Sequence, residues 1–176
     1  MVLDEQMVID NYSHSIEHLW NVDLPQYLTL LEQNIEDPIP MSRFNRYGVG
    51  VATLVSELGV EKDFPGCYLL IDVDTPIYVG ISKKILNRLR QHVRGNTHFD
   101  ASLAYRIASA KYPHNYTRQQ AMEDTKFRTE FNKAQEMIQG FDVAFVEIDN
   151  PLVLYVFEPF CAMRFRTGKW NTFETH

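Results

Sequence analysis

The sequence predicts a small α/β (α+β) domain, in which helices flank a mainly antiparallel three-stranded sheet and an acidic helical extension precedes it. Two short β-rich runs, residues 67–73 (CYLLIDV) and 76–81 (PIYVGI), are separated by a tight turn, which is typical of an antiparallel hairpin. An amphipathic helix is predicted directly after them, at 82–95. A third apolar run, 141–148 (FDVAFVEI), supplies the third strand.

The composition is that of a globular protein. The chain has 176 residues, of which 45% are hydrophobic, so it is long enough for one domain with a substantial core. It has no 18-residue apolar run and no basic segment before an apolar stretch near residue 1, so we expect neither a membrane span nor a signal peptide. Cys67 and Cys161 lack a metal-binding spacing such as CxxC. We therefore expect two reduced core thiols in a cytoplasmic protein.

Two regions are expected along the chain. Residues 1–63 form an acidic helical N-terminal extension and connector, with amphipathic helices at 3–20 and 24–36 and a short helix at 49–58. Residues 64–176 form the domain that contains the predicted sheet.

Helix start signals place two of the helices in that domain. Ser82 can cap the helix at 82–95, whose apolar residues recur at every third or fourth position. After the third strand, Asn150 followed by Pro151 is a good start for a helix at 150–165.

The charge is distributed unevenly. The net charge is -6, but residues 1–42 carry eight acidic residues and no lysine or arginine, which leaves 15 acidic against 17 basic residues in 43–176. Local potential, rather than net charge, governs binding to a polyanion. Residues 75–99 contain no carboxylate and have five basic side chains: Lys83, Lys84, Arg88, Arg90 and Arg94.

Several side chains in the hairpin and the helix after it are candidates for chemistry. Lys84, Arg88 and His92 recur every four residues, which places them on one polar stripe of the helix. Taken alone, this stripe also fits a solvated basic face. Tyr68 and Tyr78 lie on the two strands of the hairpin, and each taken alone also fits a packed core aromatic.

Glu158 is the only charged residue between Asp149 and Arg164, in the apolar stretch LYVFEPFCAM. A carboxylate in apolar surroundings is costly unless it is paired or binds a cation. Alternatively, Glu158 lies at an exposed edge of its helix, where the carboxylate is solvated.

Together these residues resemble the GIY-YIG nuclease family. GCY (66–68) stands for the first name-giving motif and YVG (78–80) for the second, and the resemblance covers about residues 64–176. The stretches ASLAYRIA and NTFETH are similar to a small bacterial branch of the family. The resemblance implies a GIY-YIG-like fold with six catalytic residues: Tyr68, Tyr78, Arg88, His92, Glu158 and Asn171.

The resemblance also implies the chemistry. The expected function is a Mg²⁺-dependent DNA endonuclease, with Mn²⁺ as the alternative metal, that hydrolyses phosphodiester bonds. Glu158 would hold the metal and Arg88 would clamp the scissile phosphate. Tyr68 would be the general base or its relay, and His92 would position Tyr68 or move a proton.

Tyr78 and Asn171 would hold the site by hydrogen bonds, and Gly80 would allow a close backbone approach. The expected nucleic-acid contacts are made by four basic residues: Lys84, Arg88, Arg90 and Arg94. At the end of the last helix, Arg164, Arg166 and Lys169 either extend this basic surface or form a solvated helix end.

Some alternatives stay open. The chain departs from the family pattern in a helical insertion at about 97–139, with helices at 100–111 and 117–139, which makes the substrate uncertain. RNA is not excluded as the substrate, and a non-catalytic module that keeps the fold and binds nucleic acid or protein is the alternative function. The acidic N-terminus either packs on the core, contacts the basic helix of the same chain, or docks a basic partner.

Overall fold

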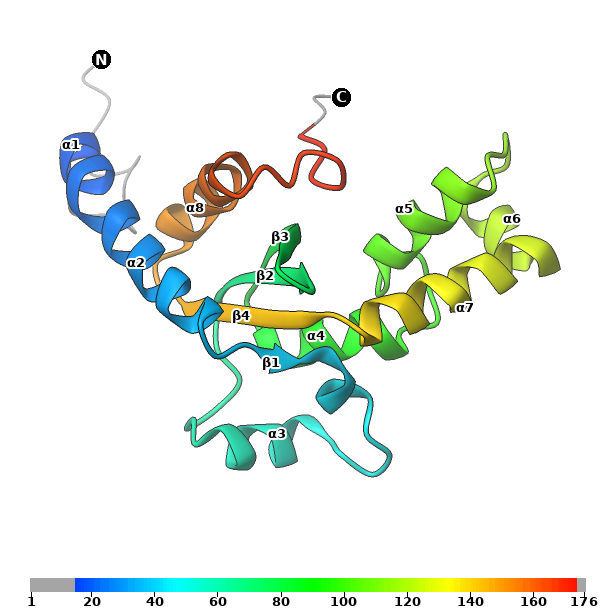
Figure 1. The fold of residues 1–176 in the computed structure, drawn as a ribbon, viewed down its shortest axis with the longest axis horizontal. Coiled ribbons are helices and arrows are strands. Elements are labelled where there is room, and N and C mark those ends of the chain that lie inside the picture. The colour runs from blue at the N-terminus through cyan, green and yellow to red at the C-terminus, as the bar shows by residue number, and fades with distance from the viewer. Residues whose placement is uncertain (1–14, 174–176) are drawn as a thin grey trace, which may run out of the picture.

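The structure is a computed structural model that describes residues 15–173. Helices cover both faces of one antiparallel sheet (Figure 1), which confirms the predicted fold class. The helices are α1 (Ile16–His18), α2 (Leu24–Ile35), α3 (Val51–Leu58), α4 (Ile85–Arg94), α5 (Ser102–Lys111), α6 (Arg118–Glu123), α7 (Thr125–Gln139) and α8 (Pro151–Arg164). The strands are β1 (Ile39–Pro40), β2 (Gly66–Asp72), β3 (Thr75–Ser82) and β4 (Asp142–Glu147). No helix of this part of the chain is both long enough and apolar enough to cross a membrane.

The sheet has four strands in the order β1-β4-β2-β3, so the predicted number of three is wrong. The additional strand is β1, where Ile39 pairs with Val143 and Pro40 with Asp142. Two residues are too few for an alternating pattern, and a proline is tolerated there because β1 is an edge strand. The predicted hairpin and third strand are confirmed as β2, β3 and β4.

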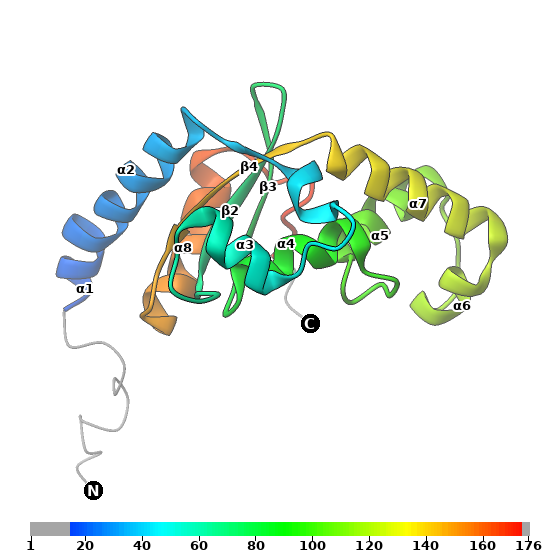
Figure 2. The ribbon, with the colours of Figure 1, turned by 90° about the horizontal axis from the view of Figure 1, so that it is seen from below.

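Each face of the sheet has its own core. Tyr68 and Leu70 of β2 lie in the core with α4, α5 and α7, whereas Cys67 and Leu69 lie in the core with α2 and α8. Figure 2 shows the sheet between these two groups of helices. Since successive side chains of a strand point to opposite faces, β2 contributes to both cores and is almost completely buried.

The N-terminal region is part of this architecture. Of the helix predicted at 3–20, residues 3–14 lie outside the described residues. The rest continues through a π-helical turn, Leu19–Asp23, directly into α2, where two separate helices were expected. Pro25 is accommodated because the first turn of a helix does not need its N–H. Leu24 and Leu31 are fully buried against the sheet.

The helix predicted at 117–139 is interrupted at Asp124, so the expectation of one helix is wrong. Asp124 is extended, with φ −72° and ψ 124°, and its carboxylate accepts a hydrogen bond from Phe127 N. An aspartate in this position caps the following helix, and the chain therefore starts α7 anew after α6.

A remote aspartate caps α4. Asp63 accepts hydrogen bonds from Leu86 N at 2.9 Å and from Asn87 N at 3.0 Å. The predicted cap, Ser82, instead accepts a hydrogen bond from Lys84 N, one residue before the helix begins. Asp63 therefore links the N-terminal connector to the helix that carries Arg88 and His92.

Candidate active site

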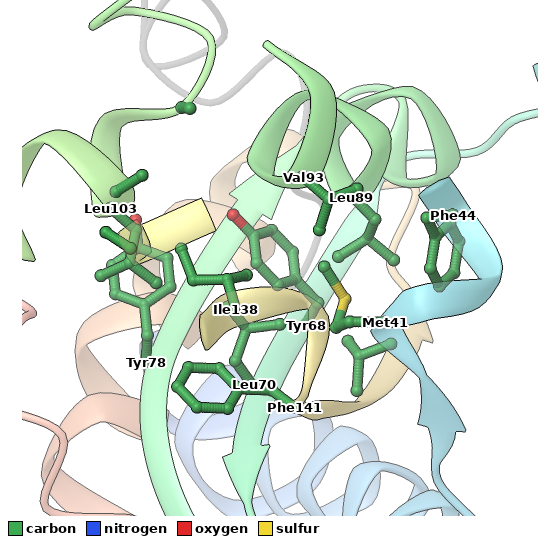
Figure 3. Close-up of a cluster of buried hydrophobic side chains, with 14 of the residues drawn as sticks. Met41, Phe44, Tyr68, Leu70, Tyr78, Leu89, Val93, Leu103, Ile138 and Phe141 are labelled. Atoms are coloured by element: carbon green, nitrogen blue, oxygen red, sulfur yellow. The ribbon is translucent and has the colours of Figure 1, made fainter. Parts of the chain in front are cut away.

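The two motif tyrosines lie side by side on one face of the sheet. Tyr68 of β2 pairs with Gly80 of β3, and Leu70 pairs with Tyr78, so both phenol rings lie on the same face of the sheet. Figure 3 shows the ring of Tyr68 near Leu89 and Val93 of α4 and that of Tyr78 beside Leu103 of α5. Their ring centres are 6.2 Å apart. Tyr68 is 1% exposed and Tyr78 8% exposed.

Gly80 leaves room for the ring of Tyr68, because a glycine has no side chain. A Cβ added at Gly80 would lie 2.3 Å from Tyr68 Oη and 2.4 Å from its Cζ. The close approach expected at this glycine is therefore made by a side chain of the same protein, since the phenol lies over the glycine backbone.

His92 completes a buried aromatic group with the two tyrosines. Its Nε2 lies 2.6 Å from Tyr68 Oη, and its ring centre is 5.9 Å from that of Tyr78. The side chain is 0% exposed. Burial, and then the positive charge of Arg88, hold the pKa of His92 well below 6.5. The imidazole is therefore neutral at neutral pH and has one nitrogen with a free lone pair.

Arg88, one turn before His92, is held by the chain that follows α4. Its Nη1 donates to the carbonyl of Asp100 at 2.8 Å, and its Nη2 donates to Ser102 Oγ at 2.9 Å. These contacts fix a half-buried guanidinium next to Tyr68, where its positive charge favours the phenolate.

The pKa of Tyr68 nevertheless lies well above the ordinary value of 10, because complete burial outweighs the attraction of Arg88. Burial raises the pKa of Tyr78 as well. Both phenols are therefore protonated at neutral pH in the protein alone. Tyr68 can accept a proton only if its own proton leaves at the same time, and His92 Nε2 is within hydrogen-bond distance of it.

Glu158 approaches from the other side of the sheet. It lies on α8, which packs against the opposite core and against β3, the edge strand. The carboxylate is partly buried, and that burial raises its pKa, while the charge of Arg106 acts in the opposite direction. Its negative charge raises the pKa of both tyrosines and also that of Cys67 in the core with α2 and α8, so Glu158 lies within electrostatic reach of the two tyrosines.

Asn171 closes the open edge of the sheet. Its Oδ1 accepts a hydrogen bond from Val79 N at 2.9 Å, and its Nδ2 donates to Val79 O at 2.7 Å. An edge strand otherwise presents unpaired backbone groups. The side chain of Asn171 thus acts as one further pairing residue and holds the segment after α8 against β3.

The remaining basic candidates lie away from this group. Lys84 precedes the helix and is exposed, so it does not extend a helical stripe with Arg88 and His92. Arg90 and Arg94 line a hollow of about 200 Å³, whose lining also includes Gln91 and Asp100, two contacts of Arg88. The structure thus groups four of the six predicted catalytic residues directly, namely Tyr68, Tyr78, Arg88 and His92. Glu158 lies on α8, which packs against β3, and Asn171 binds the β3 backbone.

Arg106 is the residue that the sequence reasoning missed. It lies on α5, its charge acts on Glu158 and Tyr78, and its Nη1 donates to the carbonyl of Trp170. A sequence pattern could have identified it, because Arg106 is the only charged residue between Asp100 and Lys111. The same reasoning that singled out Glu158 applies to it.

Comparison with known families agrees with this geometry. Residues 64–150 match the family model described as GIY-YIG catalytic domain. Searches of curated proteins and of solved structures found no match to the chain. The matched segment contains β2, β3 and α4, and with them Tyr68, Tyr78, Arg88 and His92. The segment 64–150 therefore belongs to the GIY-YIG family of nucleases.

Proposed function

We propose that this protein is a Mg²⁺-dependent DNA endonuclease, and that the residues at the β3 edge hydrolyse a phosphodiester bond. The observation that carries the proposal is the buried pair of Tyr68 Oη and His92 Nε2, 2.6 Å apart and next to the guanidinium of Arg88. A phenol whose proton can pass to a neutral imidazole, beside a fixed positive charge, has the parts that phosphodiester hydrolysis needs.

The base in this mechanism is the Tyr68–His92 pair rather than a free phenolate. Attack forms a bond between the water oxygen and phosphorus and breaks the P–O ester bond, and the leaving oxygen takes up a proton from solvent water. The water proton passes to Tyr68 Oη while the phenolic proton passes to His92 Nε2. Because the pKa of His92 is low, its imidazole is neutral at neutral pH and has a lone pair that can take the proton.

Arg88 is the phosphate clamp. Two of its contacts go to Asp100 O and Ser102 Oγ, and a guanidinium has five N–H donors. Nη1 also makes longer contacts with Phe99 O and Gln91 Oε1. A phosphate would bind the donors that these contacts do not use, and the fixed orientation lowers the cost of ordering the side chain. A lysine in this place has neither the planar fork nor the same anchoring.

Glu158 would hold the metal. Among the described residues no other side chain makes an ion pair or hydrogen bond with this partly buried carboxylate, and no group of three or more metal-ligating side chains surrounds it. This donor set fits Mg²⁺, which binds one or two carboxylates and keeps several waters. Bound there, the metal would act as a Lewis acid that neutralises charge developing on the phosphate.

The experiment is a cleavage assay with four substrates: supercoiled plasmid, linear duplex DNA, single-stranded DNA and RNA. Each is incubated with Mg²⁺, Mn²⁺ or EDTA. We expect DNA cleavage with Mg²⁺ that EDTA abolishes and that Glu158→Gln loses, whereas Glu147→Gln, an exposed position on β4, retains it. Binding without cleavage under all metal conditions would favour the non-catalytic module, and cleavage of RNA alone would overturn the choice of DNA.

A further inference from the structure

A pocket of about 300 Å³ lies between α5 and the segment after α8. We call it the α5 pocket. Figure 1 shows the chain after α8 turning from that helix toward α5. The side chains that matter for its chemistry are Ser102, Tyr105, Arg106, Arg118, Lys169 and Trp170.

The α5 pocket adjoins the catalytic residues. Ser102, in its lining, accepts the hydrogen bond from Arg88 Nη2. Arg106 donates to the carbonyl of Trp170, the residue directly before Asn171, and its charge acts on Glu158. A ligand in this pocket therefore lies next to a phosphate held by Arg88.

The charge of the α5 pocket favours an anion. Arg106, Arg118 and Lys169 line it, and no aspartate or glutamate does. Among the described residues, none of these three cations has a carboxylate as an ion-pair partner. Three cations that line one hollow with no carboxylate in its lining create a positive potential that attracts phosphate groups. In addition, Ser109 Oγ lines the pocket, is buried, and has no hydrogen-bond partner in the described part of the chain.

The walls of the α5 pocket are aromatic. The guanidinium of Arg118 lies 5.8 Å from the ring centre of Tyr105, and Lys169 Nζ lies 5.0 Å from that of Trp170. Cations alternating with aromatic faces are the surface that nucleotides prefer, because phosphates bind the cations while bases and sugars contact the rings.

Exposed aromatic side chains continue this surface beyond the α5 pocket. Phe99 is 72% exposed and contacts His98, with ring centres 4.0 Å apart. Tyr116 is 51% exposed and stacks on His114, which in turn contacts Tyr105. The exposed rings of Phe99 and Tyr116 offer further stacking faces beside the pocket. A volume near 300 Å³ is at the lower end for pockets that take an organic ligand.

We propose that the α5 pocket binds one nucleotide of the cleaved DNA strand, adjacent to the scissile phosphate. Arg106, Arg118 and Lys169 hold its phosphate, and Tyr105 and Trp170 contact its sugar and base. This inference rests on the proposed nuclease function, and it assigns substrate positioning to the helical insertion.

The test measures nucleotide binding without cleavage. The chain has two tryptophans, so the full-length Trp20→Phe variant reports on Trp170 alone. Thymidine 3′,5′-bisphosphate is titrated in EDTA, with inorganic phosphate and thymidine as separate probes. We expect a saturable change in Trp170 fluorescence with the bisphosphate, at an affinity above that of either separate probe.

Variants locate the binding site. In the same background, Arg118→Ala and Lys169→Ala should each weaken bisphosphate binding about tenfold, as expected for the loss of a charge-assisted contact. Both side chains are exposed, so the fold should be retained. Lys111→Ala, at the exposed end of α5 and outside the pocket lining, is the matched control and should bind like the parent.

Unchanged affinity in both pocket variants would overturn the proposal, and so would equal affinity for inorganic phosphate and the bisphosphate. The outcome is independent of the nuclease assay. Saturable binding that depends on Arg118 and Lys169 in a protein that does not cleave DNA would contradict the proposed function alone. Active cleavage with unaffected binding in these variants would contradict the α5 pocket alone.

Discussion

The phenol ring of Tyr68 lies over the backbone of Gly80, its partner in the β2–β3 hairpin, so closely that a Cβ on the glycine would be 2.3 Å from Tyr68 Oη. This contact directs the hydroxyl toward His92 Nε2. The two glycine–tyrosine motifs are therefore one structural unit, in which the glycine of the second motif creates the space for the tyrosine of the first.

Gly80→Ala should displace the Tyr68 ring. We expect a loss of about 1–3 kcal/mol in the free energy of unfolding, as for overpacked cores, and a fall in cleavage rate of about a hundredfold from misplacement of the hydroxyl. Gly50→Ala is the control, since a Cβ there meets nothing within 4 Å. Urea unfolding and a DNA cleavage assay check both effects, and full activity in Gly80→Ala would show that the Tyr68 position is unimportant.

Asp63→Ala should destabilise α4. The carboxylate accepts two backbone hydrogen bonds at the start of this helix, and loss of such a cap costs about 0.5–2 kcal/mol. In a chain of this length, 1 kcal/mol corresponds to roughly 2–4 °C in Tm. Ser82→Ala should lower Tm less, because Ser82 bonds only the residue before the helix. A larger fall in Tm for Ser82→Ala than for Asp63→Ala would show that Ser82, the cap predicted from the sequence, caps α4 instead of Asp63.

The parts of the fold that follow local patterns were predictable from the sequence. The hairpin, the third strand and α4 all show clear periodicity, and their predictions are confirmed. Strand β1 was not predictable, because its pairing of Ile39 with Val143 depends on a partner about a hundred residues away. The cap of α4 by Asp63 and the break before α7 at Asp124 each depend on one side chain that accepts a backbone hydrogen bond. Helical periodicity over many residues does not reveal such a single contact.

The sequence pattern proposed the residues of the candidate site but did not predict their arrangement. Helical spacing placed Lys84, Arg88 and His92 on one stripe, whereas α4 begins after Lys84 and buries His92 completely. Spacing alone does not tell which side of a helix faces a core. Arg106 was missed because its contacts with the segment after α8 arise only in the folded chain.

His92 should make the stability depend on pH. Burial lowers its pKa well below 6.5 in the folded protein, whereas the unfolded chain takes up a proton near pH 6.5. The stability is therefore fully present above that pH and is lost as the pH falls, by up to about 1.4 kcal/mol per pH unit. Urea unfolding from pH 8 to pH 5 should show a steeper loss in the wild type than in His92→Gln. Parallel curves would mean that His92 is not buried in its neutral form.

Arg88 should not be replaceable by lysine. Arg88→Ala should lower the cleavage rate at least as much as loss of the base, about a hundredfold or more. Arg88→Lys should not restore it, because a lysine cannot contact Asp100 O and Ser102 Oγ and also bind a phosphate through a planar fork. Steady-state cleavage rates of the two variants check this. Wild-type rates in Arg88→Lys would reduce the role of Arg88 to a simple positive charge.

The most direct test of the Tyr68–His92 pair as the base is the single-turnover rate of DNA cleavage by Tyr68→Phe with saturating Mg²⁺. The change removes one oxygen and leaves a ring that fits the buried position over Gly80. We predict an unchanged DNA affinity and a rate at least about a hundredfold lower, within the ~10²–10⁴ range of general-base catalysis. A rate close to that of the wild type would contradict the account, because no proton could then pass through Tyr68 to His92.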